Sequence, residues 1–87
     1  ALDNLLTTVF YEEQTVKVYP NPVSELLHIQ KNNLDNLDLK IYNLLGKLVF
    51  EAEKVSEEIN LSSLSSGVYI AKFETENFQK SLKIIKK

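Results

Sequence analysis

The chain has 87 residues, enough for one domain with a single hydrophobic core. Hydrophobic residues make up 44% and charged residues 25%, a balance typical of globular rather than disordered chains. The net charge is −2 and all ten cationic side chains are lysines, which argues against a nucleic-acid-binding protein with a strongly basic surface. The lack of cysteine excludes disulfides, a thiolate nucleophile and cysteine-ligated zinc, and no apolar run is long enough for a transmembrane segment.

Residues 1–15 differ from the rest of the chain. Their apolar and polar residues follow no sustained period, which predicts a linker from an upstream part of the protein, with one extra strand at Thr8–Tyr11 as an option. Because the chain begins at Ala1 rather than Met, we expect it to be an excised or processed piece of a longer protein.

Residues 16–87 show the pattern of antiparallel β-sheet. Turn residues recur at intervals of roughly 8–12 residues, as in all-β sandwiches and barrels. Between the turns, apolar and polar residues alternate, so each strand has one apolar face. The pattern predicts an all-β, seven-stranded antiparallel sandwich. In chain order, the apolar positions are Val16 and Val18; Leu27 and Ile29; Leu37, Leu39 and Ile41; Leu48, Phe50 and Ala52; Ile59 and Leu61; Tyr69, Ala71 and Phe73; Leu82 and Ile84.

One stretch has an alternative interpretation. Apolar residues between Leu34 and Val55 also fit a period of 3.6, which is typical of an amphipathic helix. Gly46 would lie inside that helix at a cost of about 1 kcal/mol. Asn43 and Gly46 instead suit a tight hairpin turn, so the strand interpretation is favoured.

Catalytic and metal-binding chemistry finds little support. His28 is the only histidine and falls on the polar face of its strand, so it is interpreted as a solvent-facing residue rather than a catalytic base or metal ligand. The Asn- and Asp-rich stretch 32–38 offers oxygen ligands for calcium, but its spacing matches no known loop and suits ordinary turns. Tyr19, Tyr42 and Tyr69 would form a sugar-stacking platform only if all three were exposed on one face.

A set of short motifs, taken in order, resembles a known family. They are Tyr19-Pro20-Asn21-Pro22, Leu27-His28-Ile29, Leu39 to Val49 with its Asn43-Leu44-Leu45-Gly46-Lys47 turn, Ile59 to Leu64, Ser66-Gly67-Val68-Tyr69-Ile70, and the basic end Lys80 to Lys87. Together, over residues 16–87, they resemble the type A carboxy-terminal sorting domain of proteins exported by the type IX secretion system of Gram-negative bacteria.

The resemblance implies a function that composition does not reveal. Domains of this family are immunoglobulin-like β-sandwiches at the end of secreted cargo proteins. They bring the cargo through the outer-membrane translocon to the cell surface and are cut off by a sortase-like protease. Cleavage would occur before the Pro-Asn-Pro strand, within or upstream of residues 1–18. The resemblance implies no enzymatic activity, cofactor or metal, and as partners the translocon, the protease and an upstream cargo domain.

Ten residues are candidates for the sorting motif: Tyr19, Pro20, Asn21, Pro22, Gly46, Gly67, Tyr69, Lys83, Lys86 and Lys87. Pro20 and Pro22 fix φ and remove two backbone donors, which predicts a rigid extended segment at a sheet edge. Gly46 is expected to permit a tight hairpin, and Gly67 a sharp start to the next strand. We expect Tyr69 to close the core and to find a hydrogen bond for its hydroxyl.

The three lysines match the family's basic terminal strand, where the resemblance implies recognition by the export machinery. A free edge with alternating Ile and Lys is also a surface with which another sheet can pair. The main alternative is an immunoglobulin- or fibronectin-like adhesion or carbohydrate-binding module. A small hydrolase is the third hypothesis, weakened by the single histidine.

Overall fold

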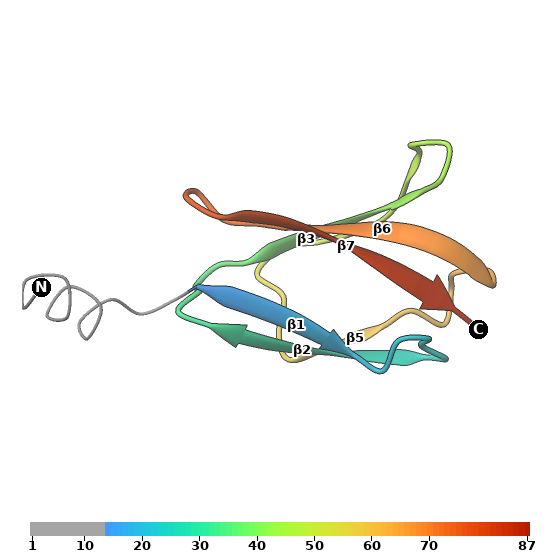
Figure 1. The fold of residues 1–87 in the computed structure, drawn as a ribbon, viewed down its shortest axis with the longest axis horizontal. Helices are drawn as coiled ribbons and strands as arrows, with labels where there is room; N and C mark the ends of the chain where they lie inside the picture. Colours follow the sequence, from blue (N-terminus) through green and yellow to red (C-terminus); the bar gives the residue numbers. More distant parts are fainter. Residues whose placement is uncertain (1–13) are drawn as a thin grey trace, which may run out of the picture.

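A computed structural model describes residues 14–87 (Figure 1). The possible strand at Thr8–Tyr11 lies outside these residues. The described part of the chain contains no helix, so the helical alternative for Leu34–Val55 is wrong. The seven predicted strands are confirmed, with the bounds β1 Thr15–Tyr19, β2 Leu26–Asn32, β3 Asp38–Asn43, β4 Leu48–Ala52, β5 Glu58–Asn60, β6 Gly67–Glu74 and β7 Gln79–Lys86.

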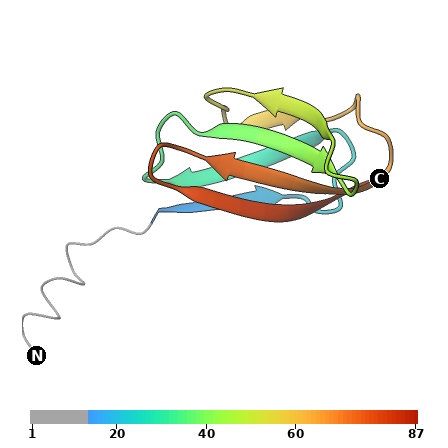
Figure 2. The same cartoon turned by 90° about the horizontal axis from the view of Figure 1, so that it is seen from above.

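The strands form two antiparallel sheets stacked face to face (Figures 1 and 2). One sheet has three strands in the order β1-β2-β5, and the other has four in the order β4-β3-β6-β7. Neighbouring strands within each sheet pair antiparallel. The domain is therefore an all-β sandwich, as the period-two pattern predicts, and of the immunoglobulin-like type that the family resemblance implies.

The core lies between the two sheets and is built from the alternating apolar positions. Leu27 and Ile29 face inward from β2, and Leu39 and Ile41 from β3, while Phe73 is fully buried on β6. Their polar neighbours point to the two outer faces, because successive side chains of a strand lie on opposite sides of the sheet. Burial of this single layer of aliphatic and aromatic side chains provides the main driving force for folding.

The β3–β4 hairpin turn is determined by two residues. Asn43 Oδ1 accepts hydrogen bonds from the amides of Leu45 and Lys47, both at 2.9 Å. The Gly46 amide donates to the Asn43 carbonyl at 3.0 Å, and Gly46 has φ +84°. A side chain at this φ is strained, so the structure confirms the predicted role of Gly46 in the hairpin.

Strand β4 departs from the predicted alternation. A bulge shifts the β3–β4 register between Ile41 and Tyr42, so that Tyr42 pairs with Leu48 while Ile41 pairs with Phe50. Leu48 therefore lies on the outer face with Tyr42 and is 42% exposed. The prediction that Leu48 shares the buried face with Phe50 was wrong, because the extra residue of a bulge breaks period two.

The backbone conformation of the loop at residues 33–36 explains why the loop is rich in Asn. Asn33 and Asn36 adopt positive φ values of 57° and 54°. Asparagine tolerates this left-handed conformation better than most residues, so these positions serve the turn between β2 and β3.

Candidate functional site at one end of the sandwich

The ten candidate residues converge on one end of the sandwich. This end, called here the Lys87 end, consists of the end of β1 at Tyr19, the β1–β2 connection (residues 20–25), the β3–β4 turn (residues 43–47), the start of β6, and the end of β7 with Lys87. In Figure 1 it lies opposite the end at which the described chain begins. The strand directions bring these segments together, because β1, β3 and β7 all run toward this end.

The β1–β2 connection crosses the outer edge of β7 and is called here the strap. The Asn21 side chain pairs with the β7 backbone as a neighbouring strand would. Its Nδ2 donates to the Lys83 carbonyl at 2.9 Å, and its Oδ1 accepts from the Ile85 amide at 2.9 Å. Val23 continues the pairing through its backbone, donating to the Ile85 carbonyl and accepting from the Lys87 amide, both at 2.8 Å. The structure thus joins two motifs that lie more than 60 residues apart in the sequence.

The strap changes two expectations from the sequence. First, the edge of β7 is not free along its whole length, because Asn21 and Val23 occupy its backbone groups from Lys83 to Lys87. Second, the Pro20–Pro22 segment bends instead of running extended, with both X–Pro peptide bonds cis. The location at a sheet edge was predicted correctly, because β1 is the outer strand of its sheet.

The three candidate lysines, Lys83 and Lys86 of β7 and Lys87 directly after it, have different environments. Lys83 and Lys87 are exposed, whereas Lys86 lies on the inward-facing side of the strand and is only 9% exposed. Its Nζ donates to the Lys87 carbonyl at 3.2 Å. The aliphatic stem of Lys86 therefore closes the end of the core, while the charges of Lys83 and Lys87 face the solvent.

Tyr69 and Gly67 complete this end from β6. The Tyr69 ring is buried in the core, and its hydroxyl donates to the Ser65 carbonyl at 2.6 Å, as expected. Gly67 begins β6 with φ +157°, and a Cβ there would lie 3.9 Å from the Tyr69 ring. The hydrogen bond from Tyr69 to Ser65 ties the loop before β6 to the strand itself.

Two features of the Lys87 end were not identified from the sequence. Val23 is fully buried and forms a parallel bridge with Lys86. In the sequence, Val23 stands out only as a single apolar residue after Pro22. The tip of the β3–β4 turn exposes Leu44 and Leu45, the latter at 94%.

The tyrosines do not form a platform. Tyr69 is in the core, Tyr42 lies on the outer face of the four-stranded sheet, and Tyr19 lies on the other sheet. The Tyr19 ring stacks on His28 with centroids 5.2 Å apart. The three rings therefore do not present one shared surface for stacking on a sugar.

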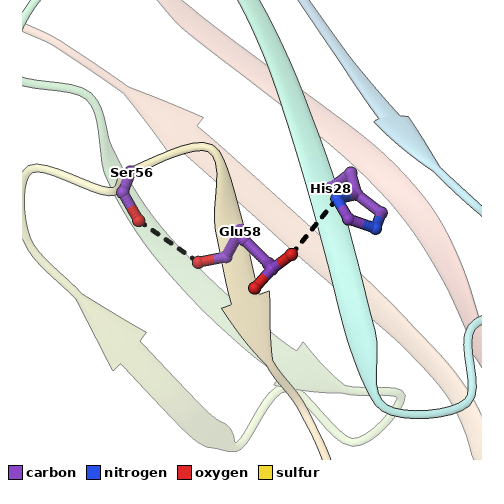
Figure 3. Close-up of polar contacts among 3 residues, drawn as sticks. All are labelled: His28, Ser56 and Glu58. Carbon is purple, nitrogen blue, oxygen red and sulfur yellow. Dashed lines mark hydrogen bonds and ion pairs between the residues drawn. The ribbon is translucent and has the colours of Figure 1, made fainter.

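A shallow hollow beside His28 has polar lining. The contacts of His28, Ser56 and Glu58, which are among its lining residues, form no catalytic arrangement (Figure 3). His28 Nδ1 lies 3.6 Å from Glu58 Oε2, and both side chains are substantially exposed. The Ser56 hydroxyl donates to the Glu58 backbone carbonyl at 3.2 Å rather than to His28. A serine nucleophile needs hydrogen-bond contact with its base, which this serine and histidine lack.

Two features are absent from residues 14–87. Among them, no cluster of three or more His, Cys, Asp or Glu side chains is placed to hold a metal ion. The same part of the chain has no helix of the length and apolarity required to cross a membrane.

Comparison with known proteins gives a family. Residues 17–87 match the family described as the secretion system C-terminal sorting domain. The chain is 36% identical over 70 residues to ulvan lyase NLR42 of Nonlabens ulvanivorans and 32% identical over 57 residues to beta-agarase D of Zobellia galactanivorans. It is 29% identical over 68 residues to an endo-acting ulvan lyase of Formosa agariphila.

These alignments include 66–75% of this chain but only 12–13% of each relative, so the chain spans a small part of the relatives' length. The family is that of type IX secretion signals, which direct export to the cell surface or the extracellular space and have no catalytic role. The chain therefore belongs to the secretion system C-terminal sorting domain family.

Proposed function

We propose that this domain directs a cargo protein, joined to its N-terminal side, through the type IX outer-membrane translocon, and that the machinery recognises the Lys87 end. The observation that carries this proposal is the strap. Its hydrogen bonds unite the Pro-Asn-Pro motif and the basic terminal strand, the two parts that the family resemblance marks, into one surface. The export machinery therefore does not need to bind either motif as a separate linear peptide.

The cargo is proposed by analogy with the relatives. The three relatives bear the names of an agarase and two ulvan lyases, enzymes much longer than the segment that matches this chain. We propose that the cargo here is also an enzyme that acts on polysaccharide outside the cell.

Removal of the domain by a sortase-like protease belongs to the same proposal. Every residue of β1, from Thr15 to Tyr19, is paired with β2. A protease requires an extended segment in its active site, so a cut inside β1 would first require this pairing to open. The cleavage site is therefore proposed to lie upstream of Thr15.

A fusion tests the sorting role directly. Residues 14–87 are placed behind a periplasm-directed reporter in a bacterium that has a type IX system, and surface exposure is measured by protease accessibility on intact cells. We expect the reporter on the surface or in the medium, and retention in the periplasm of the same strain without its translocon. Periplasmic retention in both strains would contradict the proposed function.

A further inference from the structure

Apolar, basic and acidic side chains occupy separate parts of the outer face of the four-stranded sheet. Side chains that point away from the core can be identified from the pairing register, in which Tyr42, Ile70 and Lys83 form one row across β3, β6 and β7. The next row, toward the opposite end of the sandwich, contains Lys40 and Lys72. No other element of residues 14–87 covers this face, as the two layers in Figure 2 show.

The part of this face nearest the Lys87 end is apolar. It is formed by Tyr42, Leu48, Val68, Ile70 and Ile85, all half-buried or exposed. Leu48 and Ile85 are among the most exposed large hydrophobic residues of the described chain, at 42% and 38%. Apolar side chains grouped on an uncovered sheet face are typical of an interaction site, whereas scattered ones need no explanation.

Lysines border this apolar patch. Lys40 and Lys72 are direct cross-strand partners, and like charges placed opposite each other destabilise a sheet. Lys40 lies 4.0 Å from Glu51, whereas within residues 14–87 Lys72 and Lys83 have no carboxylate at ion-pair distance. Lys72 and Lys83 thus present positive charge beside the apolar patch, and Lys40 adds a third lysine whose charge is shared with Glu51.

The far end of the same face is acidic. Asp38 and Glu74 are cross-strand partners beyond the lysine row, and Glu51 lies next to Lys40. A uniformly anionic surface such as a membrane would be repelled by these carboxylates, and the chain as a whole carries a net charge of −2. A protein surface with localised carboxylates avoids that repulsion.

The strap restricts how a partner can bind. Addition of a strand to β7 requires free backbone groups, and those from Lys83 to Lys87 already bond to Asn21 and Val23. At this end of the domain, the side chains of the outer face are therefore more accessible to a partner than the backbone of the edge.

We infer that the apolar patch of Tyr42, Leu48, Val68, Ile70 and Ile85, with Lys40, Lys72 and Lys83 at its border, is the docking face for a protein partner. The partner surface has an apolar centre flanked by carboxylates that meet the lysines. This inference rests on the proposed function, because the partner belongs to the export machinery. It specifies recognition through a sheet face rather than by strand addition.

Matched variants of the reporter fusion test this inference. Leu48→Ser changes the patch, and Leu26→Ser is its control, because Leu26 is the same residue type at 40% exposure on the three-stranded sheet. Lys72→Glu reverses a bordering charge, and Lys17→Glu is its control on β1. We expect the surface fraction to fall at least tenfold for Leu48→Ser and Lys72→Glu and to stay within twofold of wild type for both controls.

The outcomes separate the two proposals. Export of the wild-type fusion together with equal export of all four variants overturns the docking face alone. A wild-type fusion that stays in the periplasm overturns the sorting role, and the docking face with it. Urea unfolding of each purified variant establishes that it is folded, and Lys72→Glu provides the test if Leu48→Ser fails to fold.

Two other occupants of the face are tested with the purified domain. Co-sedimentation with phosphatidylglycerol vesicles that is lost in Lys72→Glu and kept in Lys17→Glu would assign the face to a membrane and overturn a protein partner. Sedimentation velocity that shows a dimer lost in Leu48→Ser and kept in Leu26→Ser would assign it to a second copy and overturn the inference in the same way. We expect a monomer and no vesicle binding.

Discussion

At the scale of single residues, Tyr69 shows how the core accommodates a polar atom. Its ring fills the space between the sheets, and its hydroxyl donates to the Ser65 carbonyl only four residues before it. The bond is short, partly buried and local, so it restrains the loop that leads into β6 at little entropic cost. The sequence predicted a partner for this hydroxyl, because buried tyrosine hydroxyls are usually hydrogen-bonded, but did not identify Ser65.

Tyr69→Phe measures this bond. The substitution keeps the ring and leaves the Ser65 carbonyl without its partner, so we expect the free energy of unfolding to fall by about 1–2 kcal/mol. Urea denaturation followed by circular dichroism gives the value. Tyr42→Phe is the control, because no hydrogen bond of the Tyr42 hydroxyl occurs within residues 14–87. Equal losses in the two variants would show that the Ser65 bond contributes nothing specific.

Ile41→Val tests the burial pattern. Ile41 is fully buried, so loss of one methylene should lower the free energy of unfolding by about 0.5–1.5 kcal/mol. Ile85→Val removes the same group from an exposed position and should cost less than about 0.5 kcal/mol. The urea denaturation midpoints of the two variants give this comparison. A larger loss of stability at Ile85 than at Ile41 would contradict the assignment of inner and outer faces.

At the scale of the elements, local sequence predicted the strands well because alternation is a property of neighbouring residues. It failed at Leu48, where a bulge depends on the pairing between β3 and β4. It also failed at the strap, because the bonds of Asn21 and Val23 connect positions far apart in the chain. No local pattern indicates that a Pro-Asn-Pro bend lies against β7.

Gly46→Ala tests the hairpin. A Cβ at Gly46 would meet nothing within 4 Å, so the cost arises from the positive φ alone. We expect a loss of about 1 kcal/mol in the free energy of unfolding, and a smaller loss for Gly46→Asn because asparagine tolerates this region better. Thermal and urea unfolding provide the comparison, and an Asn variant less stable than the Ala variant would refute this explanation.

Asn21→Ala tests the strap. The substitution removes the acceptor for the Ile85 amide and the donor to the Lys83 carbonyl. We expect hydrogen exchange at the Ile85 amide to accelerate at least tenfold relative to the Tyr69 amide, which serves as an internal reference in the sheet. Asn21→Asp keeps the acceptor and should restore part of the protection. Unchanged exchange at Ile85 would mean that the strap does not close this edge in solution.

At the scale of the whole molecule, the antiparallel topology places the candidate sorting residues at one end. The sequence and the family resemblance suggested ten candidate residues, and the structure brings the Pro-Asn-Pro segment, the start of β6 and the end of β7 into direct contact there. The sequence did not predict this convergence, because it depends on strand order and direction. The fold also separates exposed Lys83 and Lys87 from Lys86, whose stem is buried.

The central claim is that the export machinery reads the Lys87 end, and the surface fraction of the reporter fusion tests it most directly. Lys83→Gln with Lys87→Gln removes two exposed charges at this end, and Lys17→Gln with Lys54→Gln removes two exposed charges elsewhere. Each change should alter the free energy of unfolding by less than about 0.5 kcal/mol. We expect at least a tenfold loss of surface reporter for the first pair and wild-type export for the second, whereas equal export of both pairs would contradict the claim.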